Sequence, residues 1–125
     1  MKADRKKPCA GCPWRRVSIN GWLGDETPEG FVREAHGDGL MPCHRTVNYD
    51  DPNWESTLDD AQQCAGMAIY RANVCKSPRH PDALRLAADR ENVFALPQEF
   101  IDHHSQCVGF DDMDERRANG EEIGL

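Results

Sequence analysis

The sequence predicts a small, mostly α-helical single domain whose N-terminal half is rich in loops. Its 125 residues suit one domain. Apolar residues recur at spacings of three and four behind helix-start signals, which is typical of amphipathic helices. Ten glycines and eight prolines interrupt the chain, and a mean hydropathy of -0.76 is low for a fold held by burial alone. We therefore expect an internal staple, for which the chain offers six cysteines.

In the first half of the chain we expect one helix between turns. Residues 1–8 are expected to be a flexible basic arm, and residues 9–12 a tight turn. Residues 17–23 alternate weakly between apolar and polar, which predicts a short strand or a turn. Thr27 then offers an N-cap, Pro28 suits the first helical position, and Gly37 is a natural stop. This pattern predicts a helix between Thr27 and Gly37.

In the second half we expect three longer helices and one short one. Ser56 or Thr57 can cap a helix whose apolar positions run to Ala72, with Cys64 inside it and Cys75 near its end. Pro81 opens a helix over residues 83–88, and Pro97 opens another that ends at Gly109. A short acidic helix is expected over residues 111–118. The chain thus divides into an arm (1–8), a cysteine-centred domain (9–110) and an acidic C-terminal tail (111–125).

The cysteines are expected to be reduced. The first seven residues contain no apolar run of the kind found in a secretory signal, and no stretch approaches the ~20 apolar residues that span a membrane. The expected compartment is therefore the cytoplasm, with no membrane partner. Thiols stay reduced there, and clustered cysteines more often bind metal than form disulfides.

Four of the thiols are candidates for one metal site. Cys9 and Cys12 form a Cys-x-x-Cys pair, which lets two thiolates converge on one ion from a single turn. Cys43 leaves a Gly- and Pro-rich loop, and Cys64 is followed by Gly66, where a small residue allows close approach. The alternative is that the cysteines are small buried apolar residues with no ligand.

The order of the motifs adds a resemblance. The chain carries Cys-x-x-Cys-Pro-Trp-Arg at residues 9–15, then Cys43-His44, then Cys64-Ala65-Gly66, then Leu84-Arg85-Leu86-Ala87. This set resembles a family of small bacterial and phage proteins without an assigned activity, and the likeness covers roughly residues 8–88. The resemblance implies that Cys9, Cys12, Cys43 and Cys64 belong to one site, with Cys75 and Cys107 outside it.

The identity of the cofactor is open between an iron–sulfur cluster and zinc. One pair plus two separate thiols is similar to the [4Fe–4S] pattern of some DNA-repair enzymes, and a proline after a ligand cysteine recurs in cluster loops. Zinc ribbons usually bring a second Cys-x-x-Cys, but His44 or His36 can complete a Cys₃His zinc site. We expect the [4Fe–4S] cluster slightly ahead of Zn²⁺.

Other residues are candidates for contacts around that cofactor. Trp14 can shield it from water or stack on a base, and Arg15 can hold a phosphate. His44 follows a candidate ligand directly. A redox dithiol at Cys9 and Cys12 fits poorly, because a charged arm precedes the pair and a proline follows it. His103, His104 and Cys107 could form a second metal site on one helical turn. The simpler interpretation is one solvent-facing and one partly buried histidine beside a core cysteine.

The charge is uneven along the chain. Residues 1–16 carry six basic groups and one acidic group, or +5, whereas residues 17–125 carry nine basic and 21 acidic groups, or -12. Such an acidic chain does not have the basic face that a duplex-DNA binder needs. The basic end can contact a phosphate locally, although a solvated tail is the simpler interpretation.

Three hypotheses about function follow. The preferred one is a cytoplasmic metal- or [4Fe–4S]-binding domain of bacterial or phage type, with a structural or sensory role through a protein or nucleic-acid partner. The second is a small metal-dependent enzyme acting on nucleic acid or in a redox reaction, with His44 as its first acid or base. The third is an acidic interaction protein or inhibitor that zinc staples. Whether the protein is an enzyme stays open at this point.

Overall fold

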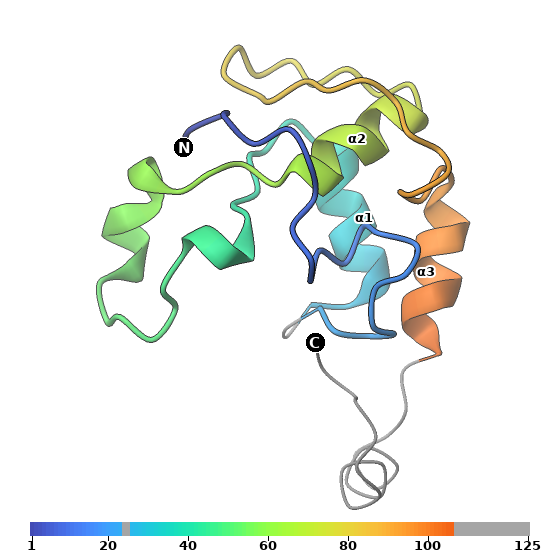
Figure 1. The fold of residues 1–125 in the computed structure, drawn as a ribbon, viewed down its shortest axis with the longest axis horizontal. Helices are drawn as coiled ribbons and strands as arrows, with labels where there is room; N and C mark the ends of the chain where they lie inside the picture. The colour runs from blue at the N-terminus through green and yellow to red at the C-terminus, as the bar shows by residue number, and fades with distance from the viewer. Residues whose placement is uncertain (24–25, 107–125) are drawn as a thin grey trace, which may run out of the picture.

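A computed structural model describes residues 1–23 and 26–106 (Figure 1). Helices are the only regular elements in these two ranges. The α-helices are α1 (Pro28–His36), α2 (Ala65–Asn73) and α3 (Pro97–Ser105), and two 3₁₀ helices, η1 (His44–Thr46) and η2 (Trp54–Asp60), lie between α1 and α2. Long turn and loop segments join them. The expectation of a helical fold with a loop-rich first half is confirmed, but the helices are shorter than the sequence pattern suggests.

Helix α1 forms where the sequence predicts it. The Thr27 hydroxyl accepts a hydrogen bond from the backbone N–H of Gly30 at 3.0 Å, and Pro28 occupies the first turn. The helix ends at Gly37, whose N–H bonds the carbonyl of Glu34. Local signals therefore specify this element completely.

The helix expected from Ser56 or Thr57 to Ala72 is wrong in its first half. A 3₁₀ helix covers Trp54–Asp60, the chain is extended over residues 61–64, and α2 begins only at Ala65. The extended segment is paired on both sides. Its carbonyls and N–H groups bond Lys2 on one side and residues 41 and 43 on the other, at 2.7–2.8 Å. These contacts outweigh the helical spacing, so Cys64 is the N-cap of α2 and does not lie inside a helix.

The arm expected to be flexible supplies one side of that pairing. Lys2 donates its N–H to Ala61 and accepts the N–H of Gln63, and the Asp4 N–H bonds the side chain of Gln62. In Figure 1 the N-terminal segment runs beside the chain that enters α2. The described structure thus places the first residues of the arm against the fold, in contrast to the expectation of a free arm.

The helix expected over residues 83–88 is absent from the structure. This stretch is irregular, because side chains of distant residues bond the backbone within it and directly after it. Leu84 donates its N–H to the side chain of Gln63, and Asp89, which follows the stretch, donates its N–H to the side chain of Asn73. Residues 17–23 form turns, with Gly21 at φ 75°. Helix α3 begins at Pro97 as expected and ends at Ser105, while the helix end expected at Gly109 and the helix expected over 111–118 lie outside the described residues.

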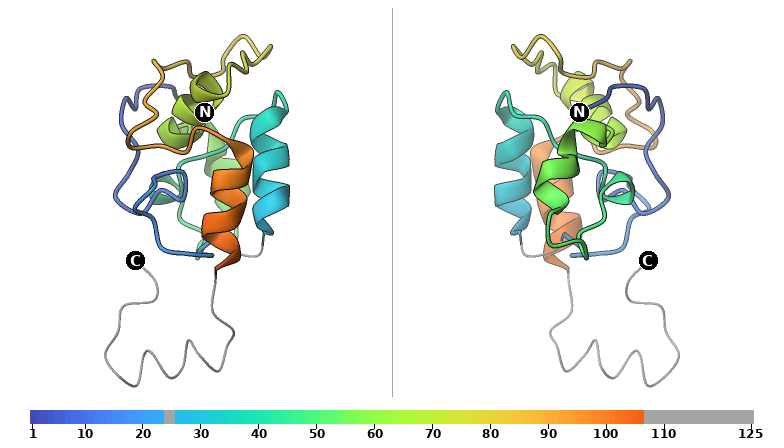
Figure 2. Two further views of the ribbon diagram at one scale, coloured as in Figure 1. Left: turned by 90° about the vertical axis from the view of Figure 1, so that its right-hand side faces the viewer. Right: turned by 90° about the vertical axis from the view of Figure 1, so that its left-hand side faces the viewer.

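An aromatic cluster forms the centre of the core. Trp14, Tyr70 and Phe100 are fully buried, and the Trp14 ring lies 4.5 Å from the Tyr70 ring and 4.3 Å from the Phe100 ring. Phe31 of α1 packs on the same indole at 5.5 Å. Helices α1 and α3 lie side by side, as Figure 2 shows, and α1 also contacts α2. The residue that joins all three helices thus belongs to the loop segment that carries the first two cysteines.

Candidate functional site

The first two thiols are held in a turn that is locked to the rest of the fold. The N–H of Cys12 bonds the carbonyl of Cys9 at 3.1 Å, and the N–H of Arg15 bonds the carbonyl of Cys12. The chain then forms an antiparallel bridge between Arg15 and Val93. The expected tight turn at residues 9–12 is confirmed, and it is anchored to the segment that leads into α3.

The other two thiols come from two paired segments. Cys43 donates its N–H to Gln62 at 2.7 Å, and Cys64 donates its N–H to Met41 at 2.8 Å, across the antiparallel bridge between Pro42 and Gln63. The pairing brings Cys43 beside the N-terminus of α2. The extended segment over residues 61–64, which replaces the first half of the expected helix, therefore positions both Cys43 and Cys64.

The four thiols meet in the core. Cys9, Cys12, Cys43 and Cys64 are all buried and all free. The Sγ atoms of Cys12 and Cys64 are 3.9 Å apart. Cys12 and Cys43 lie close enough to Cys9 to lower the pKa of its thiol. Residues up to 55 positions apart in the sequence thus belong to one buried cluster, with Cys12 and Cys64 in direct contact.

Proton sharing divides the thiols into acceptors and donors. Hydrogen bonding from Cys12 lowers the pKa of Cys9 to about 5, with His44 and Cys43 acting in the same direction. Hydrogen bonding from Cys12 also lowers the pKa of Cys64. The pKa of Cys12 is raised well above its usual range, because its protonated thiol can share its one hydrogen with Cys64 or with Cys9, and burial acts in the same direction. Burial raises the pKa of Cys43. Two of the four groups are therefore biased towards the thiolate form that metals bind.

Gly66 fits against the sulfur of Cys12. A Cβ atom at this position would collide with Cys12 Sγ and would lie 3.0 Å from Trp14 Cβ. Any larger residue in the first turn of α2 would therefore displace the thiol or the indole. The close approach that the sequence predicts at Gly66 is present, and the group that approaches is the Cys12 thiol.

The candidate cofactor contacts have separate positions. Trp14 is buried beside Cys12, and its Nε1–H has no hydrogen-bond partner within the described part of the chain. Because the side chain is fully buried, it leaves no face for base stacking. Arg15 donates to the carbonyl of Ala10 at 2.8 Å, within the cysteine turn itself. His44 lies with both ring nitrogens 3.9 Å from Cys9 Sγ and packs edge-on against Trp22.

Three further histidines bond groups other than the thiols. His36 bonds the Tyr70 hydroxyl at 2.8 Å. His103 bonds the carbonyl of Ser18, and His104 is buried with both ring nitrogens bonded. The interpretation of His104 as a satisfied residue of the apolar stripe agrees with these contacts. Cys75 is exposed at the end of α2, and Cys107 lies outside the described residues.

The sequence did not point to several neighbours of the site. Trp22 packs on His44, and Arg5 and Tyr49 lie near enough to Cys43 for their charges to influence one another. Gln63 is buried and bonds Asp82 and Leu84 through its side chain. The one sequence signal for these contacts is the presence of Trp22 near the first cysteine motif, and that signal is weak.

The donor set suits a soft metal ion, although its geometry is not preassembled. Within residues 1–23 and 26–106, no three His, Cys, Asp or Glu side chains already surround one point as metal ligands do. Among the described sulfurs, those of Cys12 and Cys64 are in direct contact, and the four do not face a common centre. Four buried, reduced thiols, two of them with a lowered pKa, nevertheless provide the donor chemistry that a thiolate metal site requires.

Comparisons of this chain with protein-family models, with curated proteins and with solved structures give no match. Among the described residues, no helix combines the length and the apolar character needed to cross a bilayer.

Proposed function

We propose that Cys9, Cys12, Cys43 and Cys64 bind one metal ion, with Zn²⁺ as the preferred occupant, and that this ion staples the loop-rich half of the fold. The observation that carries the proposal is the 3.9 Å separation of Cys12 Sγ and Cys64 Sγ between two buried side chains. Two thiolates at ~2.3 Å from one tetrahedral zinc lie about 3.8 Å apart. The contact therefore has the spacing of two ligands on a single ion.

The same distance favours zinc over the cluster in this proposal. In a [4Fe–4S] cluster each cysteine binds a different iron, so two ligand sulfurs lie farther apart than two ligands of one ion. The spacing supports zinc, whereas the motif order favours the cluster slightly. The [4Fe–4S] cluster is the second candidate, supported by the shielding position of Trp14 and the proline after Cys12.

A structural role suits the rest of the molecule. The α-helices have nine residues each, and isolated helices of that length are marginal in water. The thiols come from three segments that short hydrogen-bonded pairings join. A common ion would fix these segments together and contribute its binding free energy to folding. The proposal also implies a reduced compartment such as the cytoplasm, and a partner, protein or nucleic acid, that recognises the stapled surface.

The first test is metal analysis with an absorption spectrum on anaerobically purified protein. We expect one zinc per chain and no visible colour. Cys12→Ser is expected to lose the metal and the cooperative unfolding transition, whereas Cys75→Ser, which changes an exposed thiol, keeps both. Because Cys12→Ser can fail to fold, the wild-type protein is also loaded with Co²⁺, whose spectrum reports the number of thiolate ligands.

Two results would contradict the zinc assignment. Iron with acid-labile sulfide and a broad visible band would replace zinc by the cluster. A wild-type protein that folds cooperatively without metal, and that binds neither Zn²⁺ nor Co²⁺ under reducing conditions, would remove the metal site altogether.

A further inference from the structure

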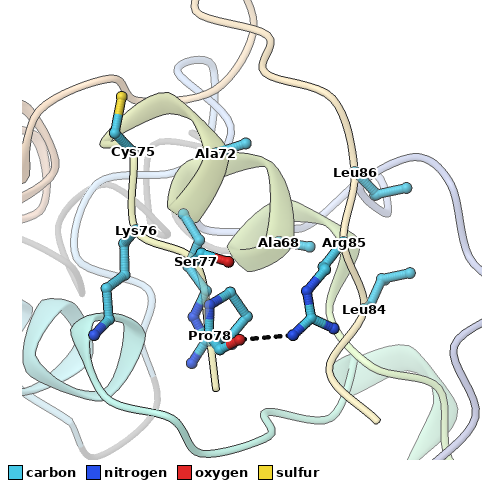
Figure 3. A pocket seen from close by; sticks show the side chains of 10 residues that line it. Ala68, Ala72, Cys75, Lys76, Ser77, Pro78, Leu84, Arg85 and Leu86 are labelled. Carbon is cyan, nitrogen blue, oxygen red and sulfur yellow. Dashed lines mark hydrogen bonds between the residues drawn. The ribbon is translucent and has the colours of Figure 1, made fainter. Parts of the chain in front are cut away.

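A second candidate site lies at the other end of α2. A pocket of about 300 Å³ opens between this helix and two loop segments, residues 76–78 and 84–86 (Figure 3). Its volume is at the lower end of the range for small-molecule sites. Cys64 is the N-cap of α2, whereas the residues of α2 that line the pocket start at Ala68, and none of the four thiols lines it.

The walls are apolar over much of their surface. In Figure 3, Ala68 and Ala72 project from α2, and Leu84 and Leu86 lie on the facing loop. The two alanines leave space that larger side chains would fill. The loop over residues 84–86 has no regular structure, and its Leu84 N–H bonds the side chain of Gln63, so the pocket lies between this loop and α2. A helix over residues 83–88, as the sequence predicts, would not keep this arrangement.

The charged groups at the pocket have one sign. Arg71, Lys76 and Arg85 line it, and none of the described residues that line it is acidic. This local excess of three positive charges stands in a chain with a formal charge of -7. Asp38 lies near Arg71 and Lys76 outside the pocket, but its carboxylate accepts the backbone N–H of Arg79. Within the described ranges Arg16 and Glu99 form the one salt bridge, so the three cations have no carboxylate partner there.

The two arginines are fixed in place and still have donors to spare. Arg71 is buried and donates to the carbonyls of Ala35, Gly37 and Gly39. Arg85 donates to the carbonyls of Pro78, His80 and Ala83. Each guanidinium has five N–H groups, so each keeps two. Carbonyl dipoles orient these cations without neutralising their charge, and the few remaining donors suit a single carboxylate better than a phosphate dianion.

We infer that this pocket binds a small organic carboxylate with an apolar body. The carboxylate lies among Arg71, Lys76 and Arg85, and the apolar body contacts the alanine and leucine side chains. The inference is independent of the metal proposal, because it uses no thiol of the four.

The test uses 2-naphthoate as the probe on the purified full-length protein as isolated under reducing conditions. Methyl NMR spectra are recorded during titration with 2-naphthoate, with the neutral 2-naphthalenemethanol and with inorganic phosphate. We expect saturable shifts of the Ala68, Ala72, Leu84 and Leu86 methyl groups with naphthoate. The alcohol and phosphate are expected to bind at least about ten-fold more weakly, because the alcohol lacks the negative charge and phosphate lacks the apolar body.

Variants separate charge from cavity. Arg85→Gln and Lys76→Gln are each expected to weaken naphthoate binding about ten-fold, whereas Arg33→Gln, on the exposed face of α1, leaves it unchanged. Ala72→Leu fills the cavity, retains all three cations and is expected to abolish naphthoate binding. Equal binding of acid and alcohol, equal binding of phosphate and naphthoate, or no shift at the pocket up to several millimolar naphthoate would overturn the inference.

Discussion

The imidazole of His104 in α3 donates a hydrogen bond from Nε2 to the carbonyl oxygen of Pro13, at 2.9 Å. Its Nδ1 accepts the backbone N–H of Gly21, also at 2.9 Å. Pro13 directly follows Cys12, so this histidine ties the last helix to the cysteine turn. A backbone N–H can only donate, and therefore the geometry requires the neutral ring with its proton on Nε2.

Stability is expected to fall in mild acid because of His104. Burial lowers the pKa of His104 from 6.5 to about 4, with the positive field of His103 acting in the same direction. The folded pKa is depressed, so the unfolded chain binds the proton more readily. This contribution to stability is complete above pH 6.5 and is lost as the pH falls towards 4. The loss reaches about 3 kcal/mol by linkage, and urea unfolding between pH 7.5 and 4.5 measures it.

The control for this prediction is His104→Gln, which cannot be protonated. The wild type should be the more stable protein at pH 7.5, and the difference should shrink as the pH falls. Comparing the two proteins cancels acid effects that act on the thiols. A difference that stays constant with pH, or an NMR titration of His104 near pH 6.5 in the folded protein, contradicts the assignment.

Substitution of Gly66 by alanine is expected to destabilise the protein, although alanine is the better helix former by ~1 kcal/mol. The new methyl group would overlap Cys12 Sγ and lie 3.0 Å from Trp14 Cβ. Overpacking of this kind costs about 1–3 kcal/mol, and it should also weaken metal binding by moving a ligand. Denaturant unfolding and competition with a metal chelator measure the two effects.

Gly39→Ala is the matched control for that substitution. A Cβ atom at Gly39 has no heavy atom within 4 Å, so the change should be neutral or stabilising by a few tenths of a kcal/mol, roughly. If both alanine variants behave alike, the close approach at Gly66 has no energetic role.

Arg71 is expected to be far more sensitive to lysine substitution than an exposed arginine. Its guanidinium reaches three carbonyls at the C-terminal end of α1, at 2.7–3.0 Å, from a buried position. A lysine ammonium lacks the fork that makes these bonds together. We expect Arg71→Lys to cost about 2–3 kcal/mol in unfolding free energy, against a change within about 0.5 kcal/mol for Arg33→Lys on the surface. Equal effects would show that the three bonds do not support the fold.

His44→Ala distinguishes a neighbour from a ligand. Both ring nitrogens of His44 lie 3.9 Å from Cys9 Sγ. This is a contact distance, and neither nitrogen is closer to the sulfur than the other, as one would be if it shared a metal ion with Cys9. We expect His44→Ala to retain one metal per chain, because four thiols complete the site. If His44→Ala loses the metal while Cys43→Ser retains it, the site is Cys₃His and Cys43 is not a ligand.

Elements specified by short-range signals were predicted well. Thr27, Pro28 and Gly37 delimit α1, and Pro97 marks the start of α3, because capping and proline geometry act within one helical turn. The set of four cysteines also came from sequence context, and the structure brings them together in the core. That they bind a metal stays a prediction.

Elements that depend on distant partners were not predicted. The spacing of Leu58, Ala61, Ala65 and Ala68 is helical, yet residues 61–64 pair with the chain on both sides. The stretch over 83–88 is apolar at helical spacing, yet side chains of Gln63 and Asn73 bond the backbone at Leu84 and at Asp89, next to this stretch. No local pattern contains these long-range hydrogen bonds, which outweigh a helix propensity that is high for the alanine and leucine residues of the 83–88 stretch.

The sequence by itself determined that this is a helical, thiol-rich domain, where α1 and α3 begin, and which four cysteines are candidates for one site, because residue type and local spacing carry that information. Only the tertiary structure decided that Cys64 caps α2 at 3.9 Å from Cys12, that Gly66 makes room for that thiol, and that Trp14 is a core residue instead of a contact surface. These facts depend on the simultaneous packing of segments that lie more than 50 residues apart, and the free energy of such packing appears only when the segments meet.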